Sequence, residues 1–306
     1  MQTKFFSFIF LGIVAIFSTN CGSKKAEPML HIKLKIDNSQ ERLDNFGNAA
    51  PSGKTGNATQ TPTMNSIGIH YVSFLKDQFA PTGTVVLNTP ETSAGGAKAI
   101  DFAAAKRAAD GETWVSIPLK DVAVGTYQYV RTSVSYQNFG IKFNLINVPN
   151  IGNLMDEAGT AASFLGFNTY ISTHKVNKLD DVVNANKLQG YWSFETNLHP
   201  AFAAYNKVYT GQSPEGATTV VNPIAGTSPV PAGSCLVTGK FGAPLVISGT
   251  ETGDVTVTLS FSTNQSFEWK EIIKNGKWDI DVNRAMTEQV VDMGLRGMKA
   301  SVVTAQ

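Results

Sequence analysis

Alternation of apolar and polar residues is the dominant pattern along this chain. Residues 29–36 place Leu30, Ile32 and Leu34 on one face and mainly basic residues on the other, and residues 255–261 alternate Val, Leu and Phe with Thr and Ser. A period of two is that of a β-strand with one buried face. Similar segments predict further strands at 67–74, 84–87, 114–119, 127–136, 139–145, 167–173, 190–195, 218–221, 235–241 and 245–248.

Two kinds of interruption separate these strands. The apolar positions change face at Gln137-Asn138, which predicts a β-bulge or a hairpin turn there, because one extra residue reverses the two faces of a strand. Residues 47–65 and 211–233 are rich in Gly, Pro and small polar residues. Such composition predicts long surface loops.

Two segments have helical signals instead. Asp101 stands where it can cap an Ala-rich helix over 102–109 that Gly111 would end. Asp281 stands before a stripe at helical spacing, which Gly294 would end and whose apolar residues are Val282, Met286, Val290 and Met293. The sequence therefore predicts a mainly β fold: an antiparallel β-sandwich with one short Ala-rich helix and one C-terminal helix. A single domain over 29–306 is the simpler expectation, with two subdomains divided at the 211–233 loop as the alternative.

The N-terminus predicts export. Lys4 precedes an apolar run from Phe5 to Phe17, which is too short for a comfortable membrane span but typical of a secretory signal, and Cys21 follows directly after Ser18-Thr19-Asn20. This arrangement resembles the lipobox of bacterial lipoproteins, although Ser18 and Asn20 replace the usual Leu and small residue. The resemblance implies that residues 1–20 are removed, that Cys21 carries the lipid, including palmitate, and that residues 21–28 form a tether. Ordinary secretion and an uncleaved anchor are the alternatives.

Charge and cysteine content narrow the possible partners. The whole chain has 25 basic and 24 acidic residues, and removal of Lys4 with the signal leaves 24 of each. A protein without basic excess is not expected to bind nucleic acid. Cys21 and Cys235 are the two cysteines of the sequence, so lipidation of Cys21 would leave no internal disulfide, and Cys235 is expected to be a buried core thiol.

Acidic residues next to aromatic ones are the best candidates for a ligand site. Glu195 stands three residues after Trp192. Trp269 is flanked by Glu268, which directly precedes it, and by Glu271, which stands two residues after it. Aromatic rings stack on sugar faces and paired carboxylates cleave glycosidic bonds, so a glycan site or a glycan hydrolase is one interpretation. Strands that bury the aromatic residue and expose the acid give the same pattern. No established nucleophile, phosphate-loop or metal motif occurs, so we assign no catalytic residue and no cofactor.

Metal binding would depend on two histidines. His31 and His70 each lie opposite the aliphatic face of a predicted strand, and they would approach each other if those strands paired. Surface imidazoles are the alternative. In addition, Leu30-His31-Ile32-Lys33 and the segment from Val124 to Arg131 resemble parts of the MbnP-type periplasmic proteins, which implies a shared sandwich topology and a copper-handling role; the paired cysteines of that family are missing here.

Together these observations predict a protein of the cell envelope, held by its lipid in the outer membrane on the periplasmic or the surface face. Its expected role is non-catalytic, as a binding or structural module with an envelope protein or glycan as partner. The alternatives are an envelope glycan hydrolase and a periplasmic copper- or zinc-binding module.

Overall fold

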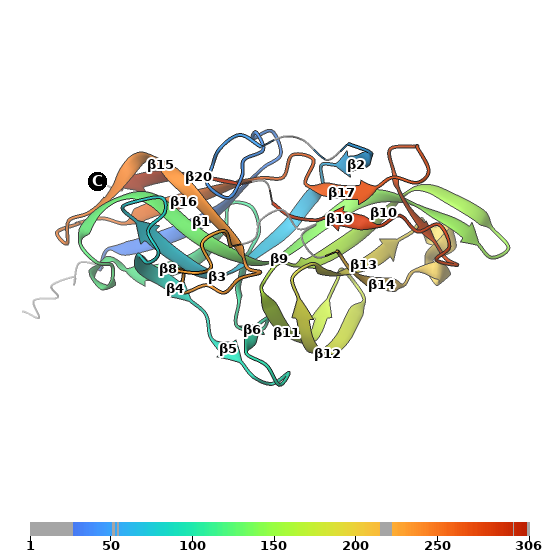
Figure 1. The fold of residues 1–306 in the computed structure, drawn as a ribbon, viewed down its shortest axis with the longest axis horizontal. Helices are drawn as coiled ribbons and strands as arrows, with labels where there is room; N and C mark the ends of the chain where they lie inside the picture. The colour runs from blue at the N-terminus through green and yellow to red at the C-terminus, as the bar shows by residue number, and fades with distance from the viewer. Residues whose placement is uncertain (1–26, 51–52, 54, 215–221, 296, 305–306) are drawn as a thin grey trace, which may run out of the picture.

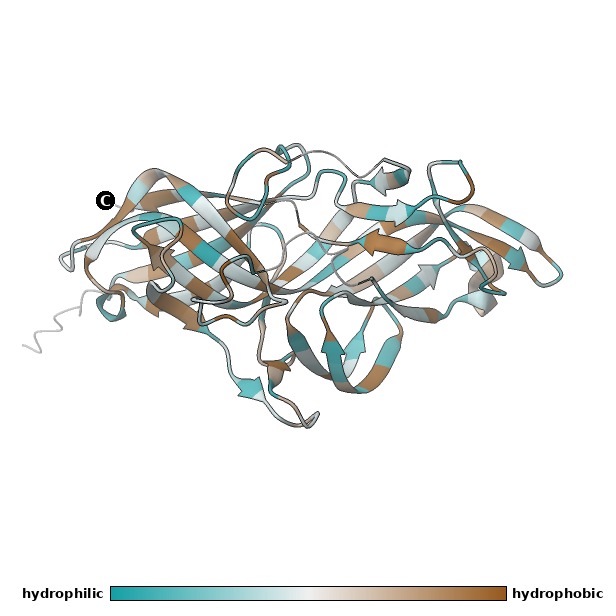
Figure 2. Ribbon diagram, in the orientation of Figure 1, coloured by the Kyte–Doolittle hydropathy of each residue, from teal (hydrophilic) through white to brown (hydrophobic). Residues whose placement is uncertain are grey.

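The computed structural model describes residues 27–50, 53, 55–214, 222–295 and 297–304, and the chain is mainly β. The strands gather at two ends of an elongated molecule, and a third, smaller group projects from one side (Figure 1). Along the strands at both ends, hydrophobic positions recur between hydrophilic ones (Figure 2). The predicted signal peptide, Cys21 and most of the tether lie outside the described residues, as does the predicted strand at 218–221.

One long strand joins the two ends. β9 (Gly125–Val148) pairs in its first half with β15 (Cys235–Ile247) and β3 (Thr63–Leu75), and in its second half with β10 (Gly152–Phe164) and β18 (Trp278–Asp281). The predicted hairpin at Gln137-Asn138 is therefore wrong, and the pairing with β10 passes those residues without a register shift. The alternative prediction, a β-bulge, is correct for the pairing with β3, whose register shifts between Met64 and Ser66, opposite Phe139 and Asn138. The apolar residues change face because Val130 and Val134 pack into one core while Phe139 and Phe143 pack into another.

The first end contains the larger core. After β15, the sheet continues through β20 (Met298–Thr304), β16 (Val255–Ser262), β1 (Met29–Asp37) and β8 (Thr113–Pro118), while β4 (Thr84–Asn88) and β7 (Lys106–Ala108) pair with β3. β1 runs parallel to β16 and antiparallel to β8, so the sheet is mixed although most pairs are antiparallel. The alternating residues Leu30, Val257 and Leu259 are fully buried, as the sequence pattern predicts.

The second end has two sheets that share one core. β10 continues to β13 (Tyr191–Asn197) and β14 (Val208–Gln212), and a three-stranded sheet consists of β19 (Val290–Asp292), β17 (Phe267–Lys270) and β2 (Asn57–Gln60). Phe139 and Phe143 of β9 share this core with Phe194, Phe267 and Trp278. β2 and the start of β3 fall inside the predicted loop at 47–65, so that prediction is correct only in part.

The projecting group is a four-stranded sheet in the order β12 (Asp180–Leu188), β11 (Asn168–Lys175), β6 (Ala99–Asp101) and β5 (Glu91–Thr92). A small aromatic cluster lies beside it, in which Phe102, Tyr136 and Phe164 are buried together. The rings of Phe102 and Tyr136 are 5.0 Å apart, and those of Phe102 and Phe164 are 5.2 Å apart.

Both predicted α-helices are wrong. Asp101 does cap a turn, since its Oδ1 accepts the backbone N–H of Ala103 at 2.9 Å, but the chain then forms β7, whose Ala108 pairs with Ile67 of β3. Tertiary pairing thus overrides the helix propensity of alanine. The helical segments in the described residues are two 3-10 turns, η1 (Leu119–Asp121) and η2 (Pro200–Tyr205).

The C-terminal segment fails as a helix for a similar reason. The carboxylate of Asp281 accepts the backbone N–H groups of Asn283 and Met286, as a cap would. However, Arg284 has a φ of +63° and Val290 pairs with Trp269 of β17. A left-handed residue ends a helical turn at once, so the apparent stripe is divided between an irregular loop and β19.

Candidate functional site

Glu195 lies on β13 and holds a loop rather than facing a cleft. It is 2% exposed, and its carboxylate accepts the backbone N–H groups of Asn177, Lys178 and Leu179 at 2.8, 2.8 and 2.9 Å. Three converging N–H donors satisfy a buried carboxylate well, because hydrogen bonds to a charged acceptor are the stronger kind. Glu195 therefore has a structural role in binding the loop between β11 and β12.

The second acidic pair is also engaged within the fold. Glu268 is buried in β17, where its Oε1 accepts the Asn57 side-chain amide at 2.6 Å, and Trp269 is fully buried in the core of the second end. Glu271 accepts the backbone N–H groups of Asn275 and Gly276. The structure thus places Glu195 and Glu268 in separate hydrogen-bond networks, and Trp269 away from the surface.

The two histidines lie on strands that are not neighbours. His31 on β1 is half-buried, with Nδ1 2.8 Å from Ser116 Oγ and Nε2 3.4 Å from Asp254 Oδ2. His70 on β3 is buried, and its Nε2 is 2.7 Å from Ser133 Oγ. β1 pairs with β8 and β16, whereas β3 pairs with β4, β7 and β9. Within the described ranges, no group of three or more His, Cys, Asp or Glu side chains has a geometry suited to a metal ion.

Trp192 is the predicted aromatic ligand residue that borders a cavity, and His70 borders a different one. The cavity at Trp192 has a volume of about 150 Å³ and lies beside β13, β14, β18 and the loop that follows β18. Trp192 and Tyr209 contribute partly exposed rings from β13 and β14, and Trp278 contributes a buried ring from β18. We call this the aromatic cavity; its remaining lining residues are Thr210, Ile280, Asp281, Arg284 and Thr287.

The ring of Trp192 is held by its neighbours. It meets the ring of Trp278 edge-on, with centroids 5.8 Å apart and an interplanar angle of 82°. On the adjacent strand, a Cβ at Gly211 would lie 2.2 Å from Trp192 Cζ2, so the indole lies directly over the backbone of β14. Only glycine leaves room for that position. The alternation of β13 also explains why Trp192 and Glu195 serve different purposes, since they point to opposite faces of the strand.

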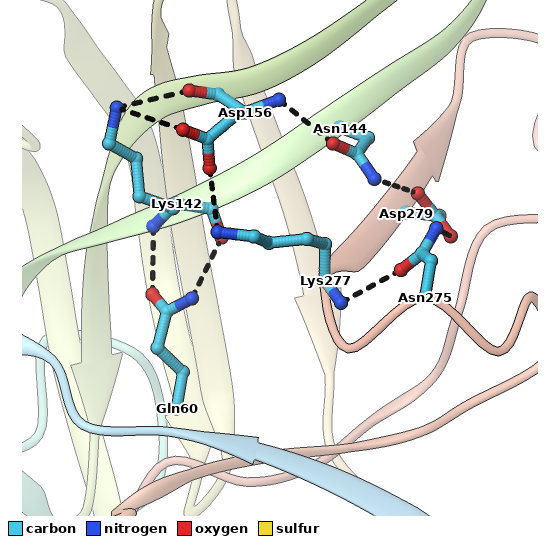
Figure 3. Close-up of polar contacts among 7 residues, drawn as sticks. All are labelled: Gln60, Lys142, Asn144, Asp156, Asn275, Lys277 and Asp279. Carbon is cyan, nitrogen blue, oxygen red and sulfur yellow. Dashed lines mark hydrogen bonds and ion pairs between the residues drawn. The ribbon is translucent and has the colours of Figure 1, made fainter.

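A polar network around Asp279 holds β18 in place (Figure 3). The carboxylate of Asp279 accepts the side-chain amides of Asn144 and Asn275 at 2.7 and 2.8 Å, and Lys277 Nζ donates to Asp156 Oδ1 at 2.6 Å. The hydrogen bond and the positive charge of Lys277 hold the pKa of Asp156 below its ordinary value. Since Asp279 alternates with Trp278 and Ile280, this network orients the two side chains that line the cavity.

The charged residues of the aromatic cavity are one acid and one base. Hydrogen bonds from the backbone N–H groups of Asn283 and its neighbours lower the pKa of Asp281, so this carboxylate is ionised at neutral pH. Arg284 is exposed, and no ion pair among the described residues uses it. The site therefore offers aromatic faces, one buried carboxylate and one guanidinium, which suits binding of a polar molecule with a flat apolar face.

Sequence reasoning missed Tyr209, Trp278 and Arg284. Trp278 does lie in a short alternation, Trp278-Asp279-Ile280, but three residues are too few to distinguish a strand from a loop. Comparison of the chain with protein-family models, curated proteins and solved structures finds no match. Over the ranges that the structure covers, no helix has both the length and the apolar character needed to span a membrane.

Proposed function

We propose that this protein is a lipid-anchored β-sandwich of the cell envelope that binds a glycan in the aromatic cavity and does not cleave it. The observation that carries the proposal is that two residues of β13 have different roles. Trp192 borders the cavity, whereas the carboxylate of Glu195 accepts hydrogen bonds from three backbone N–H groups of a loop. Stacking on Trp192 and Tyr209 would bind a sugar ring, and Arg284 and Thr210 would contact its hydroxyl groups.

Two further observations support the parts of this proposal. The arrangement at the second end, where the β2–β17–β19 sheet and the larger sheet share one core, supports a sandwich. For the anchor, β1 begins at Met29, eight residues after Cys21. A short tether of this kind would hold the folded part close to the membrane that carries the lipid.

The test is binding of soluble envelope glycans and neutral oligosaccharides, measured by calorimetry and by quenching of tryptophan fluorescence. Trp192→Ala is expected to weaken binding at least tenfold, because it removes the stacking surface. Phe79→Ala is the matched control, since Phe79 is an aromatic residue 59% exposed at a site remote in the sequence and outside the cavity lining. Equal affinity of the Trp192→Ala variant and the wild type would contradict the proposal, as would release of reducing ends from the glycan.

The two alternative functions have less support. A hydrolase would need Glu195, Glu268 or Glu271 in one pocket, and each of these carboxylates is engaged by a different segment of the chain. A copper or zinc module built on His31 and His70 would require two non-neighbouring strands to supply both ligands. We therefore propose neither in place of glycan binding.

A further inference from the structure

A second cavity lies in the projecting group of strands, away from the residues of the aromatic cavity. It has a volume of about 300 Å³ and is bordered by the turn after β6, by Arg107 of β7 and, on β11, by Tyr170 and residues 172–175. Ser172 and Thr173 are exposed at a register shift of β11, where the pairing with β12 is interrupted. Both residues border this cavity, as does Tyr170. We call it the β11 cavity.

Arg107 supplies positive charge to the β11 cavity. Its guanidinium Cζ lies 4.6 Å above the centre of the Phe102 ring, and within the part of the chain that the structure covers no carboxylate forms an ion pair with it. Stacking on an aromatic ring holds the planar guanidinium in place and leaves its N–H groups available. A carboxylate accepts two such N–H groups side by side.

His174 forms the inner wall of the same cavity. It is 4% exposed and lies against the same Phe102 ring, with centroids 5.9 Å apart, and against Phe164 at 5.0 Å. Both ring nitrogens are buried, and neither has a hydrogen-bond partner among the described residues. A buried donor or acceptor without a partner destabilises the folded protein, because it has lost its hydrogen bonds to water. A ligand group that reaches the imidazole would remove that destabilisation.

The remaining charges define the ligand more closely. Lys175 is paired with Asp180 at 3.1 Å and is not available in the same way as Arg107. Asp101 also borders the cavity, and its Oδ1 accepts the backbone N–H of Ala103. A purely anionic ligand would be repelled by Asp101, whereas a molecule with both a carboxylate and a donor group would satisfy Arg107, His174 and Asp101 together.

From this arrangement we propose that the β11 cavity binds a small organic acid that also has a hydroxyl or ammonium group. The carboxylate lies between Arg107 and His174, with the imidazole turning to donate to it, and the donor group faces Asp101. The proposal is independent of glycan binding, because none of these residues borders the aromatic cavity.

The experiment titrates the full-length protein with L-lactate and L-alanine, with acetate as the carboxylate alone and ethanolamine as the donor alone. Binding is followed by calorimetry and by the NMR resonances of the His174 ring. We expect L-lactate or L-alanine to shift those resonances and to bind at least tenfold more tightly than acetate or ethanolamine. Arg107→Gln should weaken binding at least tenfold, and His174→Phe should weaken it while leaving the fold as stable as the wild type or more so.

Lys187→Gln is the matched control. Lys187 lies in the same sheet and its Nζ is 4.6 Å from the centre of the Tyr191 ring, but it does not border the cavity. The variant removes the same charge and should bind as the wild type does. The proposal is overturned if none of the four compounds shifts the His174 resonances, if acetate binds as tightly as the two-group compounds, or if Lys187→Gln weakens binding as much as Arg107→Gln.

Discussion

At the scale of single residues, buried carboxylates in this protein hold loops in place. Glu195 accepts backbone N–H groups of nearby loop residues, and Glu288 accepts those of Ile272, Ile273 and Asp279. The partly buried Glu271 does the same for Asn275 and Gly276. Burial raises the pKa of Glu288 above its ordinary value, in spite of those bonds. An acidic residue in a strand next to an aromatic one is thus a structural feature here.

This role of Glu195 predicts a loss of stability. Glu195→Ala leaves three N–H groups without their acceptor and should lower the free energy of unfolding by about 2–3 kcal/mol, measured by urea denaturation. Glu41→Ala is the control, because the Glu41 side chain is 60% exposed and its ion pair with Lys299 should contribute little. A change at Glu195 no larger than that at Glu41 would contradict the structural role.

His70 predicts how stability depends on pH. Burial lowers its pKa from 6.5 to about 4, so the unfolded chain takes up a proton at a higher pH than the folded protein does. The contribution of neutral His70 to the free energy of unfolding is therefore fully present above about pH 6.5 and is lost as the pH falls toward 4. The free energy of unfolding should change with pH by up to about 1.4 kcal/mol per pH unit in this range. Urea midpoints of wild type and His70→Gln between pH 7.5 and 4.5 measure it. An unchanged slope in the variant would contradict the assignment; burial also lowers the pKa of His174, so a smaller slope should remain.

At the scale of elements, the geometry of the aromatic cavity depends on β14 as well as on Trp192. Gly211→Ala would place a methyl group 2.2 Å from Trp192 Cζ2, so the indole must move. We expect this substitution to cost about 1–3 kcal/mol of stability and to weaken glycan binding. Gly242→Ala on β15 is the matched control, since no atom lies within 4 Å of its added Cβ. Equal behaviour of the two variants in thermal unfolding and in glycan binding would show that the ring is not held in this way.

The elements that the sequence indicates most clearly are those in which alternation reflects one buried face, as in β1 and β16. β3 was also predicted, but its second half is buried on both faces. β12 was missed because it is exposed on much of both faces and lacks apolar alternation. The segments 102–109 and 281–294 have true caps at Asp101 and Asp281, but strand pairing with β3 and β17 decides their structure. Of the predicted ligand residues, Trp192 borders a cavity; the others could not be separated from core residues without knowledge of the tertiary contacts.

At the scale of the whole molecule, β9 connects the two hydrophobic cores, because it contributes side chains to both. Its middle residues, from Val130 to Phe139, are buried, because the strand lies between the cores and presents a different face to each. That is why a change of alternation in the sequence marks no turn. β13 and β14, which line the aromatic cavity, lie at the end opposite β1 (Figure 1), and β1 is the strand that follows the predicted tether. A lipid at Cys21 would therefore leave the cavity on the side away from the anchor.

Lipidation of Cys21 is the central proposal for this protein, and metabolic labelling with alkyne-palmitate tests it directly. Wild-type protein should take up the label and partition with membranes, and Cys21→Ala should do neither. Cys235→Ala is the control for labelling at the other thiol, which is buried in β15 and should not contribute. Absence of label from the wild type, or equal labelling of wild type and Cys21→Ala, would contradict a lipid-anchored function in the cell envelope.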